Sequence, residues 1–244
     1  MRTYAIGDIH GHLEKLKRAH VLIEADRAEV EDDEAPVVHI GDLPDRGPDT
    51  RGVIDFLMAG QAAGEPWVVL KGNHDRMMAW FLDIPPRRDH CLRSELEWVH
   101  PRLGGLDTLA SYGVDISAGR SSDDLQRDAV VCVPGTHKDF LDALPVSYRR
   151  GEVFFCHAGI RPGLSLDMQT EDDLLWIRQE FHVSDADHGA LIVHGHTPID
   201  AVTHYGNRVN IDTGAGYGKA VSAVVIEGRD VWLLTDEGRV PVLP

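Results

Sequence analysis

The sequence has few of the residues that mark several classes of protein. It contains 3 cysteines in 244 residues, Cys91, Cys132 and Cys156, and no Cys-x-x-Cys spacing, so it indicates neither a disulfide framework nor a thiolate zinc site. No segment approaches the roughly 18 uninterrupted apolar residues of a membrane helix, and the first residues do not show the pattern of a signal peptide. We therefore expect a soluble, cytoplasmic protein with no membrane partner.

Positive charge is also scarce. The 24 lysines and arginines are outnumbered by 40 aspartates and glutamates, which gives a formal net charge of −16. Proteins that bind nucleic acids neutralise backbone phosphates with clustered Lys and Arg, and no such cluster is present, so we expect no nucleic-acid partner. An anionic phosphoester substrate would need local cations, either metals or a few arginines, to offset this overall field.

The pattern of apolar residues predicts an α/β fold. With 43% hydrophobic residues, the chain is long enough for one sizeable core, and we expect a single domain over 1–244. Strand-like runs alternate with segments of helical spacing at 13–25 and 51–63, which indicates parallel strands joined by right-handed crossovers. The predicted strands are 3–6, 36–40, 67–70, 153–156, 191–193, 208–211, 220–226 and 231–234.

Two other segments have their own patterns. Between 83 and 144 the sequence changes to PPRR, acidic clusters and scattered aromatic residues, which predicts a mostly helical and looped insertion. Near the end of the chain, the last two predicted strands form a hairpin that turns at 228–230.

Glycines next to metal-binding residue types occur in five short segments. Four of the five directly follow a strand-like run. Because the carboxyl ends of parallel strands meet at one edge of a sheet, their side chains should converge there. The segments are GDIHG at 7–11, GDLPDRG at 41–47, GNHD at 72–75, HAG at 157–159 and HGHTP at 194–198.

These segments contain six candidate metal ligands. Asp8 and His10 are two residues apart, so in an extended segment they face the same way, although Asp8 could instead cap the helix that follows. The carboxylate of Asp42 has two oxygens and could bridge two cations. A mixed oxygen and nitrogen set suits a pair of divalent ions such as manganese, iron or zinc. The other three candidates are Asn73, His157 and His196.

Together the segments resemble a known family. The chain is similar to the phosphoprotein-phosphatase branch of the calcineurin-like metallophosphoesterases, in its compact bacterial and phage form. Members carry GDxHG, GDxxDRG, GNHD/E, HAG and a late GH in this order, and all five are matched here; NIDTGA at 210–215 is a weaker match. The resemblance implies a calcineurin-like β-sandwich of two mixed sheets flanked by helices in four layers, with a two-metal site at the carboxyl ends of the strands.

The resemblance also implies roles for the candidate ligands. Asp8 and His10 would bind the first metal, and Asp42 would bridge the two metals. The remaining ligands of the second metal would be Asn73, His157 and His196. The implied cofactor is a pair of divalent ions, manganese first, with iron or zinc as alternatives. A water that such a pair acidifies could serve as the nucleophile.

A second set of residues matches the catalytic groups of the family. His74 corresponds to the proton donor to the leaving oxygen, and Asp45 to the carboxylate that orients it. Arg46 corresponds to a ligand of phosphate oxygens; Asn73 and His74 would also contact the phosphate. Arg178, in LLWIR, matches a second phosphate-binding arginine, with a surface arginine beside a core Trp176 as the alternative.

Other residues in or near the motifs receive weaker interpretations. We expect His194 to be packed or to support the site from behind. Asp212 could accept a hydrogen bond from a metal-bound histidine, but an Asp opening a Gly-rich turn is the commoner explanation. For the aromatic residues Trp80, Phe81 and Trp98, helical spacing favours core packing over lining a substrate groove.

The resemblance predicts a metal-dependent phosphomonoesterase, specifically a serine/threonine protein phosphatase acting on a phosphorylated protein, peptide or small phosphoester. The alternative is a symmetrical dinucleoside tetraphosphate hydrolase; such relatives often lack the acid at the position of Asp45. A phosphodiesterase usually has GHxH in its last motif, whereas Pro198 occupies the last position here. A non-catalytic scaffold would normally have lost a ligand or His74, and none is lost. Pro44, where relatives carry a β-branched residue, removes no ligand.

Overall fold

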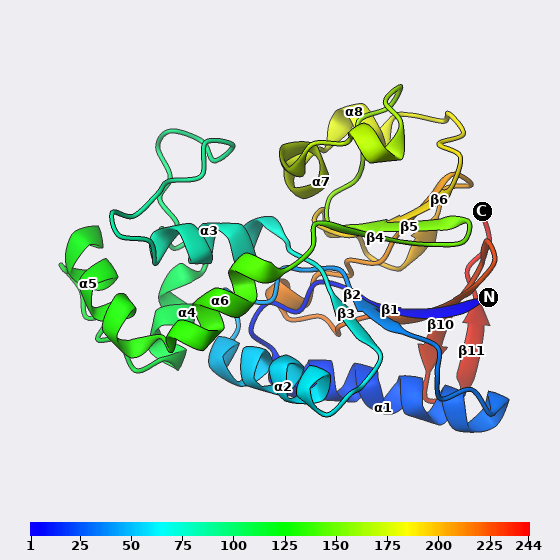
Figure 1. Ribbon diagram of the computed structural model, residues 1–244, viewed down its shortest axis with the longest axis horizontal. Coiled ribbons are helices and arrows are strands. Elements are labelled where there is room, and N and C mark those ends of the chain that lie inside the picture. The colour runs from blue at the N-terminus through cyan, green and yellow to red at the C-terminus, as the bar shows by residue number, and fades with distance from the viewer.

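The computed structural model describes residues 1–244, and two mixed β-sheets pack face to face at its centre (Figure 1). The first sheet has six strands in the order β11-β10-β9-β1-β2-β3, in which β1, β2 and β3 are parallel and the other three are antiparallel to their neighbours. Its strands are β1 (Arg2–Ile6), β2 (Val37–His39), β3 (Trp67–Val69), β9 (Ala223–Glu227), β10 (Asp230–Thr235) and β11 (Gly238–Pro241).

The second sheet has five strands in the order β4-β5-β6-β8-β7. The pairs β5–β6 and β6–β8 are parallel, whereas β4 and β7 lie antiparallel at the two edges. Its strands are β4 (Ser147–Arg150), β5 (Val153–Cys156), β6 (Leu191–His194), β7 (Thr203–His204) and β8 (Arg208–Asn210). Both sheets therefore present parallel strands whose carboxyl ends can meet at one edge.

Alternation of side chains along the strands explains the layers. In β1, Tyr4 and Ile6 pack into the cluster beneath the helices, while Ala5 faces the second sheet. In β5, Phe155 faces the first sheet and Phe154 faces the opposite side. Successive residues of a strand point to opposite faces, so strands that are apolar throughout must be covered on both sides.

Helices cover the outer faces of both sheets (Figure 1). Residues of α1 (Leu13–Val30) and α2 (Thr50–Ala62) pack on the first sheet, whereas α7 (Glu171–Trp176) and α8 (Gln179–His182) pack on the second. The helix α3 (Asn73–Phe81) directly follows β3 and begins at the edge where the parallel strands end. The predicted fold class, two mixed sheets flanked by helices, is confirmed.

The segment 83–144 lies at one end of the molecule (Figure 1). It contains α4 (Gly105–Ser111), α5 (Ser122–Cys132) and α6 (Gly135–Ala143), joined by loops. Its helices contact α2 and α3, and its buried residues, such as Leu109 and Leu141, belong to the same apolar cluster as Met78 of α3. The segment therefore shares the core of the first sheet.

The structure differs from the sequence predictions mainly at strand ends and edges. The hairpin turns at Gly228 and Arg229, because Asp230 already belongs to β10, and α1 continues to Val30 instead of ending at residue 25. The edge strands β4, β7 and β11 were not predicted, because one is polar, one has two residues and one ends in proline. Neither did the pattern predict α3, which begins inside the GNHD motif.

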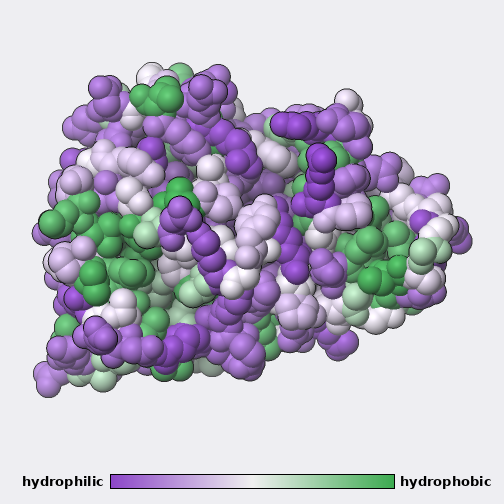
Figure 2. Space-filling model, turned by 180° about the vertical axis from the view of Figure 1, so that it is seen from behind, coloured by the Kyte–Doolittle hydropathy of each residue, from purple (hydrophilic) through white to green (hydrophobic).

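Three further properties concern the chain as a whole. All three cysteines are free thiols, with Cys156 buried in β5. No helix combines the length and the apolar character needed to cross a membrane. Hydrophilic side chains cover most of the back face, and two hydrophobic areas lie at its opposite ends (Figure 2).

Candidate active site

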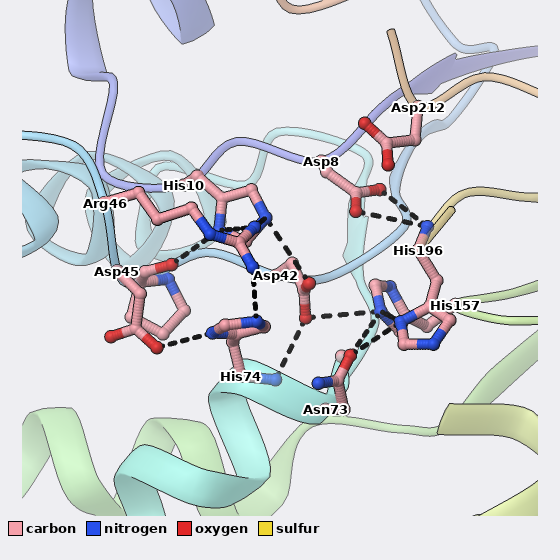
Figure 3. A network of polar contacts seen from close by, with 12 residues as sticks. Asp8, His10, Asp42, Asp45, Arg46, Asn73, His74, His157, His196 and Asp212 are labelled. Carbon is pink, nitrogen blue, oxygen red and sulfur yellow. Dashed lines mark hydrogen bonds and ion pairs between the residues drawn. The ribbon is translucent and has the colours of Figure 1, made fainter. Parts of the chain in front are cut away.

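The five motif segments converge at the carboxyl edge of the two sheets (Figure 3). Asp8 follows β1, Asp42 follows β2, and Asn73 opens α3 after β3, while His157 and His196 follow strands of the second sheet. All five side chains and that of His10 are buried. The structure thus brings the six candidate ligands into one region, as the strand-end argument predicted.

Unusual backbone conformations concentrate in this region. Six non-glycine residues of the chain have a left-handed φ, and five of them are His10, Asp42, Asp45, Arg46 and His196, with φ between 48° and 77°. Side chains with a Cβ adopt this conformation at an energetic cost, and such strain is typically held at functional sites by the surrounding structure. The loops are therefore built to display these particular side chains.

Asp75 ties two of the motif loops together. Its carboxylate accepts hydrogen bonds from the backbone N–H groups of Asp42 (2.8 Å), Leu43 (3.1 Å) and Gly72 (2.7 Å). Gly72 itself allows no side chain, because a Cβ there would lie 2.2 Å from Oδ1 of Asp42. Asp75 was not assigned from the sequence, although an acid three residues into a helix is the pattern of a capping box.

Nitrogen and oxygen atoms of four side chains come close together between Asp42 and the second sheet. Oδ1 of Asn73 lies 2.9 Å from Nε2 of His157 and 2.8 Å from Nδ1 of His196. The same Nε2 lies 3.2 Å from Oδ1 of Asp42. Because Nδ1 of His157 donates to the carbonyl of Ile40 at 3.0 Å, its Nε2 is an acceptor facing two oxygen acceptors.

Acceptor atoms that face one another without a hydrogen between them suit a cation. His196 contributes to the same group, since its Nδ1 lies 2.8 Å from Oδ1 of Asn73 and 3.2 Å from Nε2 of His157. Ligating imidazoles are commonly oriented by a backbone carbonyl on the other ring nitrogen, as Ile40 does for His157. Asp42, Asn73, His157 and His196 therefore fit a divalent metal ion.

The other oxygen of Asp42 faces His10. Its Oδ2 lies 3.5 Å from Nε2 of His10, whose Nδ1 donates to the carbonyl of Pro44 at 3.0 Å. Here the guanidinium of Arg46 already contacts that Nε2, with Nη1 at 2.5 Å. His10 can therefore ligate an ion only if Arg46 moves away, whereas the orientation of Asp42 between His10 and His157 is that of a bridging carboxylate.

Asp8 lies near the other candidate ligands but is not grouped with them. Its carboxylate accepts from the backbone N–H of His196, at 3.1 Å to Oδ2. Two of the chain's groups of mutually close candidate ligand atoms lie at this site, and Asp8 belongs to neither; they are His10, Asp42 and His74, and Asp42, His157 and His196. Burial, together with the negative charges of Asp212 and Asp42, raises the pKa of Asp8 well above its ordinary value. Asp8 thus belongs to the site without contacting the ligand to which the sequence paired it.

The electrostatics of the region also favour a cation. Burial and the charge of Asp42 raise the pKa of Asp212 to about 6, against the backbone hydrogen bond from Gly214. Burial lowers the pKa of His10, His157 and His196, so these imidazoles are neutral, as metal ligands must be. Carboxylates that repel one another beside neutral imidazoles form a site that divalent ions would stabilise.

His74 and Asp45 form a buried pair next to this group. Nδ1 of His74 lies 2.5 Å from Oδ2 of Asp45, and its Nε2 receives a hydrogen bond from Nη2 of Arg46 at 3.1 Å. The pair adjoins the bridging candidate, because the backbone N–H of His74 donates to Oδ1 of Asp42 at 3.0 Å. The structure therefore brings together the two residues predicted to supply and orient a proton.

The site opens into a small pocket. It has a volume of about 140 Å³ and is lined by Arg46, Arg178, Leu103, Trp176 and Tyr217 together with four of the buried site residues. Arg178 follows α7 and lies exposed at the rim, with Nη1 donating to Oγ1 of Thr197 at 3.2 Å. Both predicted arginines therefore line one pocket, although Arg178 is also exposed and lies beside Trp176, as the alternative of a surface arginine predicted.

A family model described as "Calcineurin-like phosphoesterase" matches residues 1–226. The chain belongs to this family. Calcineurin-like phosphoesterases use a dinuclear divalent metal site, and the grouped ligands found here agree with it. The chain is accordingly a metallophosphoesterase, with candidate metal-ligand groups at the carboxyl edge of its sheets.

One curated relative and two solved structures are similar to this chain. A bis(5'-nucleosyl)-tetraphosphatase (asymmetrical), PrpE, of Anoxybacillus flavithermus is 25% identical over 233 residues, covering 90% of this chain and 88% of that protein. The crystal structure of a candidate diadenosine tetraphosphatase superposes with a TM-score of 0.63 at 20% identity, covering 99% and 94% of the two chains. A cold-active protein-tyrosine phosphatase of a Shewanella species gives a TM-score of 0.63 at 16% identity, covering 99% and 80%.

Two further residues of the motifs, His194 and Asp212, are placed differently from the candidate ligands. His194 is fully buried on the far side of the second sheet, with its ring 5.0 Å from that of Phe181 and its Nε2 3.3 Å from Nη1 of Arg208. Asp212 accepts from the backbone N–H of Gly214 at 2.9 Å, as an Asp that opens a turn does. Packing thus explains His194, whereas Asp212 opens a turn and also adds negative charge beside Asp8.

Sequence reasoning missed two residues besides Asp75. Trp98, assigned to the core, is buried and donates its indole N–H to Oδ2 of Asp45 at 2.8 Å. Tyr217 is 66% exposed at the pocket, with its ring 5.0 Å from the guanidinium carbon of Arg46. A buried tryptophan usually needs a partner for its N–H, but nothing in the sequence indicates which carboxylate receives it.

Proposed function

We propose that this protein is a phosphomonoesterase of the phosphoprotein-phosphatase branch, which hydrolyses phosphoserine or phosphothreonine in proteins or peptides directly. The observation that carries the proposal is the buried His74–Asp45 pair beside Asp42 and Arg46. An alkoxide is a poor leaving group and gains most from a positioned acid. Neither nucleic acid nor a membrane takes part in the proposed activity.

The proposed cofactor is two manganese ions, with iron or zinc as alternatives. Asp42 would bridge them; Asp8 and His10 would hold the first, and Asn73, His157 and His196 the second. Bound there, the ions would supply a water of lowered pKa as the nucleophile. The oxygen and nitrogen ligand atoms of these six residues are compatible with each of these metals.

The remaining site residues would bind and protonate the substrate. Arg46 and Arg178 both face the pocket and would bind phosphate oxygens, together with Asn73 and His74 at its floor. Movement of Arg46 onto the phosphate would free Nε2 of His74 to hold the proton that it delivers to the leaving oxygen. Asp45 accepts from Nδ1 and would fix the imidazole in that orientation.

A second candidate activity is hydrolysis of a dinucleoside tetraphosphate. It is supported by the relative from Anoxybacillus flavithermus, whose similarity extends over 88% of that protein. The geometry leaves room for it, because the pocket adjoins a cleft of about 600 Å³ past Trp176 and Arg178. On its other side it adjoins a pocket of about 190 Å³ past Pro198 and Tyr217.

One panel of substrates separates the two activities. With manganese added, we expect kcat/KM for phosphoserine and phosphothreonine peptides to exceed that for diadenosine tetraphosphate and for bis-p-nitrophenyl phosphate. Phosphotyrosine peptides complete the panel. A preference for the tetraphosphate would replace the proposed function by the second candidate, and a preference for the diester would contradict both.

The acid role of His74 can be tested on the same panel. His74→Asn should lower kcat on a phosphoserine peptide by about 100-fold, the scale of general-acid catalysis. On p-nitrophenyl phosphate, whose leaving group hardly needs a proton, the loss should be less than about ten-fold. Equal losses on the two substrates would remove His74 from the role of acid.

A further inference from the structure

The carboxylate of Asp45 receives more hydrogen bonds than the one that it shares with His74. Its Oδ2 accepts from Nε1 of Trp98 at 2.8 Å, beside Nδ1 of His74 at 2.5 Å. Its Oδ1 accepts from the hydroxyl of Thr108 at 2.8 Å. Asp45 and Thr108 are fully buried and Trp98 is nearly so, so these contacts are shielded from water.

Thr108 holds the backbone of Asp45 as well as its side chain. Its Oγ1 lies 2.8 Å from the backbone N of Asp45 and accepts that hydrogen bond. The same oxygen lies 3.0 Å from Oγ1 of Thr50, at the start of α2. Asp45 has a left-handed φ of 77°, and these bonds stabilise it in that strained conformation.

Both donors come from the segment 83–144, and packing fixes where they point. The ring of Trp98 lies 4.8 Å from that of Phe81, at the end of the helix that carries His74. On another side, a Cβ on Gly105 would lie 3.0 Å from the ring and 2.6 Å from the carbonyl oxygen of Trp98. Only a glycine at this position of α4 leaves room for the indole.

We propose that Trp98 and Thr108 are positioning residues for the proton transfer. They bind both carboxylate oxygens of Asp45 and thereby fix its plane, so that Oδ2 accepts from Nδ1 of His74 in one orientation. A carboxylate held only by His74 could rotate and let the imidazole turn with it. The inference rests on the proposed role of His74, and it gives the segment 83–144 a part in the chemistry.

A simpler interpretation is that the two donors only satisfy a buried charge. Unpartnered buried carboxylates are costly, so removal of a donor would then lower the stability of the fold. Such a loss would affect all substrates alike. A positioning role instead predicts a loss that depends on how much the leaving group needs a proton.

The test removes each donor while keeping the shape of the side chain. Trp98→Phe and Thr108→Val are assayed with manganese on a phosphoserine peptide and on p-nitrophenyl phosphate. We expect each to lower kcat on the peptide about ten-fold, the scale of one hydrogen bond to a charged group, and to have a much smaller effect on the nitrophenyl ester. Thr108→Ser keeps the hydroxyl and should restore peptide turnover.

The matched control is Trp80→Phe. The indole of Trp80 packs between the guanidinium groups of Arg76 and Arg87, with ring distances of 4.8 and 4.5 Å, and it does not contact Asp45. This variant should keep the ratio of the two activities. In a His74→Asn background, Trp98→Phe should add little further loss, because the residue that it positions is gone.

Equal losses on the two substrates, or the same loss with and without His74, would overturn the positioning role. If His74→Asn lowers turnover of both substrates equally, the proposed role of His74 as the acid is wrong. A second measurement then tests whether Trp98 and Thr108 orient the Asp45–His74 hydrogen bond. In the zinc-loaded protein, the proton NMR resonance of His74 Nδ1–H, assigned by its absence in His74→Asn, should shift in Trp98→Phe and Thr108→Val. An unmoved resonance would overturn the inference whatever the substrate.

Discussion

Two clusters of buried histidines can be compared within this one chain. The first lies at the carboxyl edge of the sheets and includes His10, His157 and His196. The second lies between α1 and β2 and consists of His20 and His39, packed against Trp67. Burial lowers the pKa of the histidines in both clusters, so burial does not distinguish a site from a core.

Hydrogen-bond complementarity does distinguish them. In the core pair, Nε2 of His20 lies 3.0 Å from Nε2 of His39, whose Nδ1 approaches the carbonyl of Val68 at 3.4 Å. One imidazole can donate and the other accept, which satisfies both. At the edge, Nε2 of His157 lies 3.2 Å from Nδ1 of His196 and also faces oxygens of Asp42 and Asn73. A single hydrogen on Nδ1 of His196 cannot satisfy all of these acceptors, whereas a cation can.

The largest expected effect is a loss of metal and turnover when a histidine of the first cluster, but not one of the second, is replaced by glutamine. His157→Gln should abolish the binding of one metal ion and lower turnover about 1,000-fold or more, because the nucleophile depends on bound metal. His39→Gln, at an equally buried position, should keep the metal content and turnover of the parent and lose only stability. Metal content of the purified proteins and kcat on p-nitrophenyl phosphate provide the measurements.

Either of two results would break the comparison. A His157→Gln protein that retains both ions would show that the acceptors at the edge need no metal to be satisfied. A His39→Gln protein that is folded but has lost metal would show that the core pair supports the site through β2, which runs directly into Asp42.

The convergence of the candidate ligands could be predicted because the relevant pattern is local. Asp42 and Asn73 each follow a strand and sit beside glycine, and the parallel order of β1, β2 and β3 brings strand ends together without any knowledge of tertiary contacts. The separation of His194 from His196 came from the family resemblance instead, because in an extended segment the two side chains would share a face. The structure gives the reason: His194 ends β6 and points to the far side, while the left-handed φ of 66° at His196 turns its side chain into the site.

The supporting residues could not be predicted, because their partners are distant in the sequence. Trp98 and Thr108 reach Asp45 across 53 and 63 residues, and their segment contains no motif to indicate it. The edge strand β4 was not predicted for another reason. Its sequence, SYRR, is not apolar, and only its pairing with β5 makes it a strand.

A smaller effect should be seen in thermal stability. At a concentration about 1,000 times its dissociation constant, a bound ion stabilises the folded state by about 4 kcal/mol, which raises Tm by about 10 °C for a chain of this length. Manganese should give such a rise in the parent and in His39→Gln, and a clearly smaller one in His157→Gln. Calorimetry with and without EDTA measures it; equal rises in both variants would contradict the assignment.

The smallest expected effect is a loss of folding stability at acidic pH, which comes from the core pair His20 and His39. Burial, together with the charge of Arg27, lowers the pKa of His20 from 6.5 to about 4. Between these values the unfolded chain binds a proton that the folded chain does not, so stability is complete above pH 6.5 and declines as the pH falls towards 4. The difference of about 2.5 pKa units corresponds to about 3 kcal/mol.

Urea unfolding at pH 7.5 and pH 5, without added metal, should show the part of this loss that falls above pH 5, about 2 kcal/mol, in the parent. His20→Gln can still donate to Nε2 of His39 but does not titrate near neutral pH, so its stability should fall less between the two pH values. Titration of the edge cluster is common to both proteins and cancels in their difference. Identical losses would mean that the core pair is accessible to protons at little cost, and that its neutrality reflects only its packing against Trp67.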